Sequence, residues 1–173
     1  MPQKFQKDEY VVYSNAGVCH IKDIKSMKFP TEDMARTYYI LQPIGNEASI
    51  FYIPVDKENL NGKLRKVLTK IEIDTILEGI KGKECDWEND KRKRTEDFKQ
   101  ILKNKNHQEM LLMASCIYLK KQELTARGKK LHSSDEEILK KAEHYIDEEF
   151  AFSLNLPTGQ IGSYIQNKLG IET

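Results

Sequence analysis

Over the first sixty positions, short segments that are mostly hydrophobic and rich in β-branched and aromatic residues recur between polar stretches. This pattern is typical of half-buried strands. Strands are predicted over residues 9–14, 18–24, 37–42 and 49–53. Turn residues at 15–17 lie between the first two strands, and turn residues at 44–47 lie between the last two. A long polar connection containing Pro30 spans 25–36 between the second and third strands. Four or five short strands with no helix between them predict a small, strongly bent antiparallel sheet or barrel.

The pattern changes after residue 54, where hydrophobic residues begin to recur at the spacing of a helix face. Thr69 and Glu72 form a capping box, which predicts a helix that ends near residue 79 or 82 at a glycine. Further helices are expected to start near Trp87, to resume after a break at residues 104–106, to open again at 133, and to end with a short one near 158–169. The sequence therefore predicts an α+β protein, with a β domain over residues 1–62 and an all-α helical domain over 63–173.

The composition fits one or two small domains with a buried core. The chain has 173 residues, of which 39% are hydrophobic and 32% are charged. No run of about 18 apolar residues is present, so we expect no contact with a membrane. The first nine residues lack the apolar segment of a secretory signal, which predicts a cytoplasmic protein. A monomer is expected, since no heptad repeat indicates a coiled coil.

Charge is distributed unevenly along the chain. The formal net charge is +1, which by itself predicts no nucleic-acid partner. Residues 91–105, however, contain seven basic and two acidic side chains, while residues 135–149 are rich in acidic ones. The nearly neutral total therefore conceals one basic patch.

The three cysteines, Cys19, Cys85 and Cys116, lie far apart in the sequence. No C-x-x-C pair is present and the four histidines do not cluster near them, so the ligand spacings of a zinc site are absent. We therefore expect neither a metal site nor a disulfide framework, and no cofactor. Cys19 and the adjacent His20 point to opposite faces of a strand, which predicts a buried thiol and a surface imidazole.

Motifs of common enzyme sites are missing from the sequence. It has no Walker loop, no G-x-G-x-x-G, no H-E-x-x-H and no G-x-S-x-G. The acidic triplet Asp147-Glu148-Glu149 could supply acid–base groups, but such catalysis needs a pocket and a matched partner. We interpret the triplet as exposed side chains beside Tyr145 and Phe150, and we expect no enzymatic activity.

The most distinctive segment starts at Trp87, the only tryptophan, and continues into four consecutive cations at residues 91–94. The cations could neutralise phosphates without reading base sequence, and an aromatic side chain beside them could wedge between base steps. At helical spacing, however, Trp87 shares a face with Lys91, Arg94 and Phe98 and could extend the hydrophobic core. Spacing alone favours the core for Trp87 and a solvated face for the cations, and it leaves the nucleic-acid interpretation open.

A series of short motifs resembles a known family. From the N-terminus the motifs are Asp8-Glu9-Tyr10-Val11-Val12-Tyr13, Gly17-Val18 with Ile21 and Ile24, Tyr38-Tyr39-Ile40-Leu41, Ile50-Phe51-Tyr52-Ile53-Pro54-Val55, and Leu64-Arg65-Lys66-Val67. Their order, their spacing and the switch to a helical remainder are similar to the CarD/CdnL group of bacterial transcription regulators, whose N-terminal module also occurs in the transcription-repair coupling factor. Trp87 matches the tryptophan that precedes basic residues in this family.

The resemblance implies a fold and a function. An N-terminal Tudor-like antiparallel β-barrel would dock on the β subunit of RNA polymerase, with Met27, Phe51 and Tyr52 as candidate contacts. The helical domain would lie on promoter DNA at the upstream edge of the melted bubble, where Trp87 would enter the minor groove as a wedge and stabilise the open complex. Backbone contacts without sequence-specific readout are implied for Lys91, Arg92, Lys93 and Arg94. The alternative is a protein-interaction adaptor of the same fold that binds polymerase or another regulator and does not contact DNA.

Overall fold

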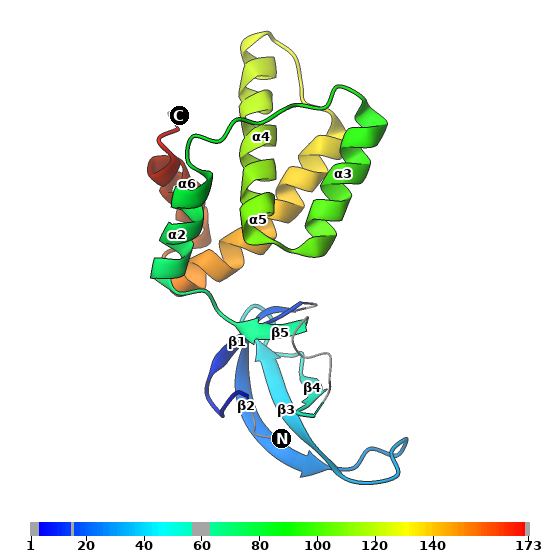
Figure 1. Cartoon of the computed structure of the whole chain (residues 1–173). Coiled ribbons are helices and arrows are strands. Elements are labelled where there is room, and N and C mark those ends of the chain that lie inside the picture. The colour runs from blue at the N-terminus through cyan, green and yellow to red at the C-terminus, as the bar shows by residue number, and fades with distance from the viewer. Residues whose placement is uncertain (1–3, 15, 57–62, 172–173) are drawn as a thin grey trace. The chain divides into compact units, whose positions relative to one another are not determined.

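A computed structural model describes residues 4–14, 16–56 and 63–171 of the chain. These residues form two compact units, one over residues 1–68 and the other over 69–173. The first unit is a β-sheet and the second is a set of helices (Figure 1). This arrangement confirms the predicted α+β class and its order along the chain.

The sheet unit contains five antiparallel strands in the order β4-β3-β2-β1-β5. Their bounds are β1 Tyr10–Tyr13, β2 Gly17–Met27, β3 Arg36–Pro43, β4 Phe51–Pro54 and β5 Leu64–Lys66. The register of β2 against β3 shifts between Ile21 and Asp23, and this bulge increases the local bend and twist. Among the described residues no pairing joins β4 to β5, so the structure establishes a bent antiparallel sheet and shows no closure into a barrel.

One cluster of side chains forms the main core of the sheet unit, and neighbouring residues such as Val12, Val18 and Tyr38 are buried as well. The fully buried members are Phe5, Val11, Cys19, Ile21, Tyr39, Leu41 and Leu64. Phe5 precedes β1 and packs its ring edge-on against Tyr39, with 5.8 Å between the ring centroids. The backbone N–H of Phe5 also donates to the Tyr39 hydroxyl at 3.1 Å, which satisfies a buried polar group inside the core.

The end of the sheet unit differs from the sequence-based expectation. The predicted domain boundary at residue 62 falls outside the described residues, and β5 follows it as a strand that pattern analysis did not place. Leu64 pairs with Tyr13 and Lys66 pairs with Val11, so these residues belong to the sheet. The two compact units therefore divide between Leu68 and Thr69.

The helical unit contains five α-helices and one 3₁₀ turn among the described residues. Their bounds are α2 Lys70–Ile80, α3 Lys91–Asn104, α4 His107–Ala126, α5 Ser133–Leu154, η1 Thr158–Gln160 and α6 Ile161–Leu169. The capping box at the start of α2 is present: the Glu72 amide donates to the Thr69 hydroxyl and the Thr69 amide donates to the Glu72 carboxylate, both at 3.2 Å. The predicted break at residues 104–106 is also confirmed, because Lys105 adopts a left-handed conformation and Asn106 caps α4.

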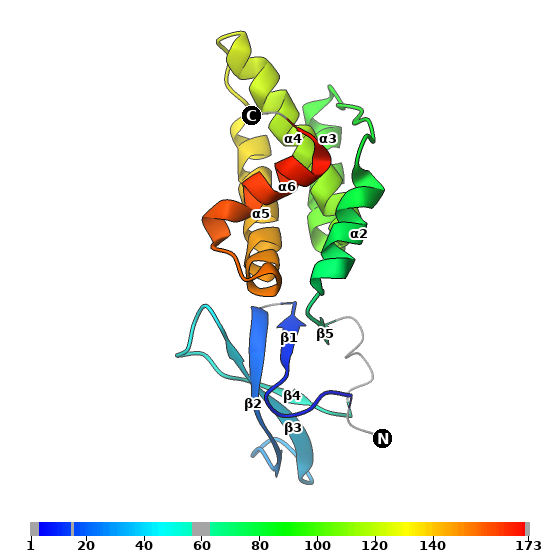
Figure 2. The same cartoon turned by 90° about the vertical axis from the view of Figure 1, so that its left-hand side faces the viewer.

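The core of the helical unit lies where α4 packs against α5 and where α2 packs against α4 and α6 (Figures 1 and 2). Its buried side chains include Ile73, Leu77, Met110, Ile117, Ile138, Ala142, Phe150 and Ile161. The Tyr164 hydroxyl on α6 donates to the Asp74 carboxylate on α2 at 2.6 Å and joins these two helices. None of the helices in the described ranges is long and apolar enough to span a membrane.

Candidate functional site

Residues 81–90 connect α2 to α3 without regular secondary structure, and we refer to them as the 81–90 segment. The sequence predicted that a helix begins near Trp87, and this was wrong, because α3 begins at Lys91. The Asp90 carboxylate accepts hydrogen bonds from the amides of Arg92 and Lys93, at 3.0 and 3.3 Å, and so caps the helix at that point. Trp87 therefore lies in the extended segment before α3 and is not part of the helix face.

Trp87 is half-buried within a cluster of three other side chains, which we call the Trp87 cluster: Trp87, Arg94, Phe98 and Lys120. The Arg94 guanidinium lies 4.6 Å from the indole centroid and the Lys120 ammonium lies 5.7 Å from it, both within cation–π range. The Phe98 ring meets the indole edge-on at 6.0 Å between centroids. The indole is thus neither sealed in the core nor freely exposed.

Arg94 occupies a different environment from the three cations before it. It is only 4% exposed, and its Nε and Nη2 atoms donate to the two carboxylate oxygens of Asp135 on α5 at 3.0 and 2.8 Å. Its Nη1 atom donates to the Glu88 carbonyl at 2.9 Å. This side chain therefore links α3, α5 and the 81–90 segment, and it does not present its charge to a phosphate. The sequence-based prediction that Arg94 contacts DNA does not fit this buried position.

Lys91, Arg92 and Lys93 are exposed on the first turn of α3. Arg92 is 91% exposed and pairs with Glu96 at 3.6 Å. Lys93 pairs with Glu88 at 3.2 Å, and this carboxylate raises the pKa of the lysine. Lys91 makes no side-chain hydrogen bond or ion pair with any other described residue. Three cations at a helix N-terminus are unfavourable for the helix dipole, and the carboxylates of Glu88 and Glu96 offset part of their charge.

A disulfide joins Cys85 in the 81–90 segment to Cys116 on α4, with 5.6 Å between their Cα atoms. The expectation that the chain has no disulfide was wrong. The two residues are separated by 31 positions, and only the packing of the segment against α4 brings them together. Cys19 stays outside this bond as a buried thiol in the sheet unit, as predicted, and the neighbouring His20 pairs with Asp8 at 3.1 Å.

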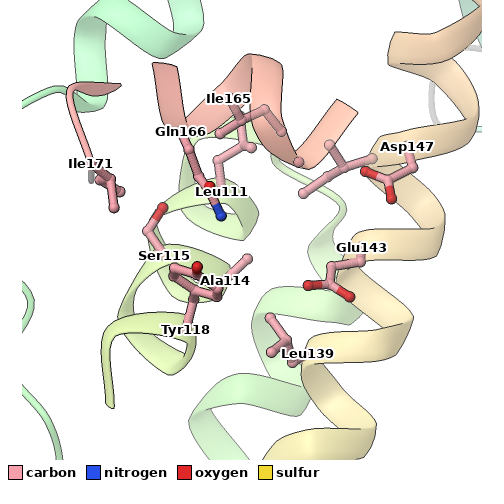
Figure 3. Close-up of a pocket in the computed structure, with 12 residues that line it drawn as sticks. Leu111, Ala114, Ser115, Tyr118, Leu139, Glu143, Asp147, Ile165, Gln166 and Ile171 are labelled. Carbon is pink, nitrogen blue, oxygen red and sulfur yellow. The ribbon is translucent and has the colours of Figure 1, made fainter. Parts of the chain in front are cut away.

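The acidic triplet on α5 is more buried than the sequence suggested. Glu149 is 2% exposed and pairs with His107 on α4 at 3.0 Å, because it lies on the same inward face as Phe150. Asp147 lines a pocket of about 100 Å³ between α4, α5 and α6 together with Glu143 (Figure 3). Burial raises the pKa of Asp147 to about 6, and the negative charge of Glu143 adds to this effect.

This pocket encloses less space than a typical substrate site. Its walls are mostly apolar side chains from three helices (Figure 3). A site for a drug-sized molecule usually encloses about 300–1,000 Å³, which is several times more space. In the described part of the chain, no group of three or more His, Cys, Asp or Glu side chains could hold a metal ion.

The candidate docking residues of the sheet unit divide by exposure. Phe51 on β4 packs against the core, with its ring 5.4 Å from that of Tyr13. Met27 is half-buried at the end of β2. Tyr52 is 44% exposed on β4, and its ring contacts Phe29 at 5.4 Å between centroids. Among the described residues β4 is an edge strand of the sheet, so Tyr52 lies on an edge that a further strand could join.

Comparison with known families now decides the nature of this unit. A family model described as the CarD-like/TRCF RID domain matches residues 5–68. The sheet unit is a CarD-like/TRCF RID domain. The match ends at the residue where the first compact unit ends. A search of curated proteins found no match to the chain.

The RID domain is a protein-interaction module and not a catalytic one, and its presence implies an interaction with RNA polymerase and a role in transcription. The family match thus confirms the resemblance that the strand motifs carried. It covers the sheet and none of the helical unit, so it includes Met27, Phe51 and Tyr52 but not Trp87. The family match therefore carries no information on the Trp87 cluster.

Proposed function

We propose that this chain is a transcription regulator whose RID domain docks on the β subunit of RNA polymerase and whose helical unit contacts promoter DNA at the upstream edge of the bubble. The observation that carries the proposal is the combination of an RID domain with a half-buried tryptophan beside an exposed cationic helix turn. The RID domain would determine where the protein binds. The helical unit would act on the DNA.

Docking would use the β4 edge of the RID domain. An edge strand offers unpaired amides and carbonyls for strand addition, and exposed side chains beside it give specificity. Tyr52 is the best placed of the three candidates, because Phe51 is committed to the core. Met27 would lie at the rim of such a surface.

A matched pair of tyrosines tests this docking. Tyr10 on β1 is 42% exposed and Tyr52 on β4 is 44% exposed. In pull-downs of core RNA polymerase by the full chain, Tyr52→Ala is expected to weaken capture at least tenfold, while Tyr10→Ala retains it. Equal losses for the two variants would contradict docking through the β4 edge.

The DNA contact would rest on Lys91, Arg92 and Lys93. A patch of three cations binds DNA weakly on its own, and non-specific Kd values are roughly 10⁻⁴–10⁻⁶ M at physiological salt. Docking on polymerase would raise the effective concentration to the mM range, so weak contacts suffice. Phosphates near the first turn of α3 would also relieve the unfavourable combination of cations and helix dipole.

Trp87 would supply the wedge that holds the bubble open. An aromatic side chain that fills the space left by unstacked bases disfavours reannealing. The indole already lies in a segment without helical hydrogen bonds, next to the cationic turn. To reach DNA it would have to leave its contacts with Arg94, Phe98 and Lys120, so insertion would require movement of the 81–90 segment.

The open-complex lifetime on a promoter template tests the wedge. Trp87→Ala is expected to shorten the lifetime while polymerase pull-down is retained, and Trp87→Phe is expected to restore part of it. Arg92→Ala is expected to lower the salt-dependence slope of DNA binding by about one. Lys99→Ala, another exposed cation on α3, serves as the control. An unchanged lifetime for Trp87→Ala would contradict the wedge.

The second candidate function is an adaptor that binds polymerase without touching DNA. The observation in its favour is the packing of the Trp87 cluster, in which the indole already contacts the side chains of Arg94, Phe98 and Lys120. In that case Trp87→Ala is expected to lower stability without changing the open-complex lifetime.

A further inference from the structure

The Cys85–Cys116 disulfide is the covalent link between the 81–90 segment and α4. Trp87 follows Cys85 by two residues, so the bond restrains the backbone that carries the indole. The indole also makes non-covalent contacts with Arg94, Phe98 and Lys120. Cleavage of this bond would therefore remove the covalent restraint on the segment that carries Trp87.

The bond is accessible from one side. Cys85 is exposed, whereas Cys116 on α4 is 6% exposed. Both line a surface groove whose other walls include Trp87 and Lys120. Thiol–disulfide exchange depends on access to the attacked sulfur, so an incoming thiolate would meet the sulfur of Cys85.

The proposed site of action determines the redox environment of the disulfide. The proposed function places this chain beside RNA polymerase, where cellular thiol reductants would reach it. In such surroundings disulfides are usually transient and are either catalytic or redox-sensing.

We propose that Cys85 and Cys116 form a reversible redox site that takes a dithiol reductant and controls the release of the 81–90 segment. The first thiolate of the reductant attacks the Cys85 sulfur, and Cys116 leaves as a thiolate that takes up a proton. The second thiol of the reductant then loses its proton and attacks the other sulfur of the reductant, which is bonded to Cys85 in the mixed disulfide. Cys85 leaves and is protonated, the reductant becomes a disulfide, and the protein gains two electrons and two protons.

The consequence for DNA rests on the proposed function of Trp87. In the oxidised protein the indole is held in the Trp87 cluster. In the reduced protein the covalent link to α4 is lost and only non-covalent contacts hold the segment, among them the hydrogen bond from Arg94 to the Glu88 carbonyl. The indole is then more easily released to a melted promoter. Reduction would thus favour the wedge, and oxidation would oppose it.

The test uses the full chain, titrated with dithiothreitol after air oxidation. Alkylation followed by peptide mass analysis is expected to label Cys85 and Cys116 only after reduction, with Cys19 protected by burial in both states. Acrylamide quenching of Trp87 fluorescence is expected to rise at least twofold on reduction, while far-UV circular dichroism stays unchanged. A Cys85→Ser variant is expected to show the high quenching without dithiothreitol, and Cys19→Ser is expected to respond as the parent chain does.

Three results would overturn the proposal. They are labelling of both cysteines before reduction, equal quenching in the two redox states, or loss of helix signal on reduction, which would indicate unfolding and not local release.

Open-complex lifetimes then separate the two proposals. If quenching responds to reduction but Trp87→Ala leaves the lifetime unchanged, the redox site stands and the wedge fails. If Trp87→Ala shortens the lifetime but redox state does not change it, the wedge stands and redox control fails.

Discussion

Arg94 is a buried cation that stabilises the fold, whereas Lys91, Arg92 and Lys93 are exposed and could bind a ligand. Its guanidinium is 4% exposed and its two hydrogen bonds to Asp135 span a buried contact between α3 and α5. The substitution Arg94→Ala would leave the Asp135 carboxylate, itself 1% exposed, without its counter-charge. Removal of one partner of a buried ion pair costs about 3–5 kcal/mol, so the free energy of unfolding is expected to fall by that amount.

Urea unfolding followed by far-UV circular dichroism measures this loss, because the signal comes mainly from the helices. For an m-value of about 2 kcal/mol/M, the midpoint is expected to fall by about 2 M. Arg92→Ala is the matched control, because Arg92 lies two residues earlier and is 91% exposed. Its loss is expected to change stability by less than about 0.5 kcal/mol.

Equal midpoints for the Arg94→Ala and Arg92→Ala proteins would refute the assignment of Arg94 as a buried structural residue. A double variant, Arg94→Met with Asp135→Leu, removes both charges and keeps apolar volume in the site. It is expected to recover most of the lost stability, because neither charge is left unpaired. A double variant no more stable than Arg94→Ala alone would show that the loss comes from packing and not from the stranded carboxylate.

Three further predictions use the same unfolding assay. Burial raises the pKa of Asp147 to about 6, so the folded state holds this proton and loses its contribution as pH rises from about 4 to 6. Asp147→Asn is expected to match the parent near pH 4 and to be more stable by about 1 kcal/mol at pH 7, after discounting for solvent screening; no pH-dependent difference would contradict this. Thr69→Ala is expected to cost about 1 kcal/mol through loss of the helix cap, whereas Thr69→Ser should retain it. Reduction of the Cys85–Cys116 bond, which spans 31 positions, is expected to cost about 3–4 kcal/mol, and an unchanged midpoint would refute this loop-closure argument.

Local rules explain why most of the fold could be predicted from the sequence. The capping box of Thr69 and Glu72 acts within one helical turn, so its residues are sufficient to locate the start of α2. The turn after α3 is equally local, because Lys105 and Asn106 end one helix and begin the next. The strand β5 was missed because it has three residues and exists through its pairing with β1, which lies about fifty positions earlier.

The candidate site was harder to predict because its geometry depends on long-range contacts. Arg94 is separated from Asp135 by 41 positions, and no spacing rule reveals that this cation is buried. The start of α3 could have been placed correctly, since Asp90 is a favoured capping residue directly before the cationic run. The disulfide left no comparable signal, because Cys85 and Cys116 meet only after the 81–90 segment folds against α4.

The distribution of the three cysteines, all of which lie in the described part of the chain, affects how two molecules can become linked. In the oxidised protein Cys85 and Cys116 are joined to each other and Cys19 is buried, so no accessible thiol is left to attack a neighbouring copy. Reduction frees the thiol of the exposed Cys85, and slow reoxidation at high protein concentration can then join two chains through it. Covalent dimers are therefore expected only in samples that have passed through a reducing step, and non-reducing electrophoresis would reveal that history.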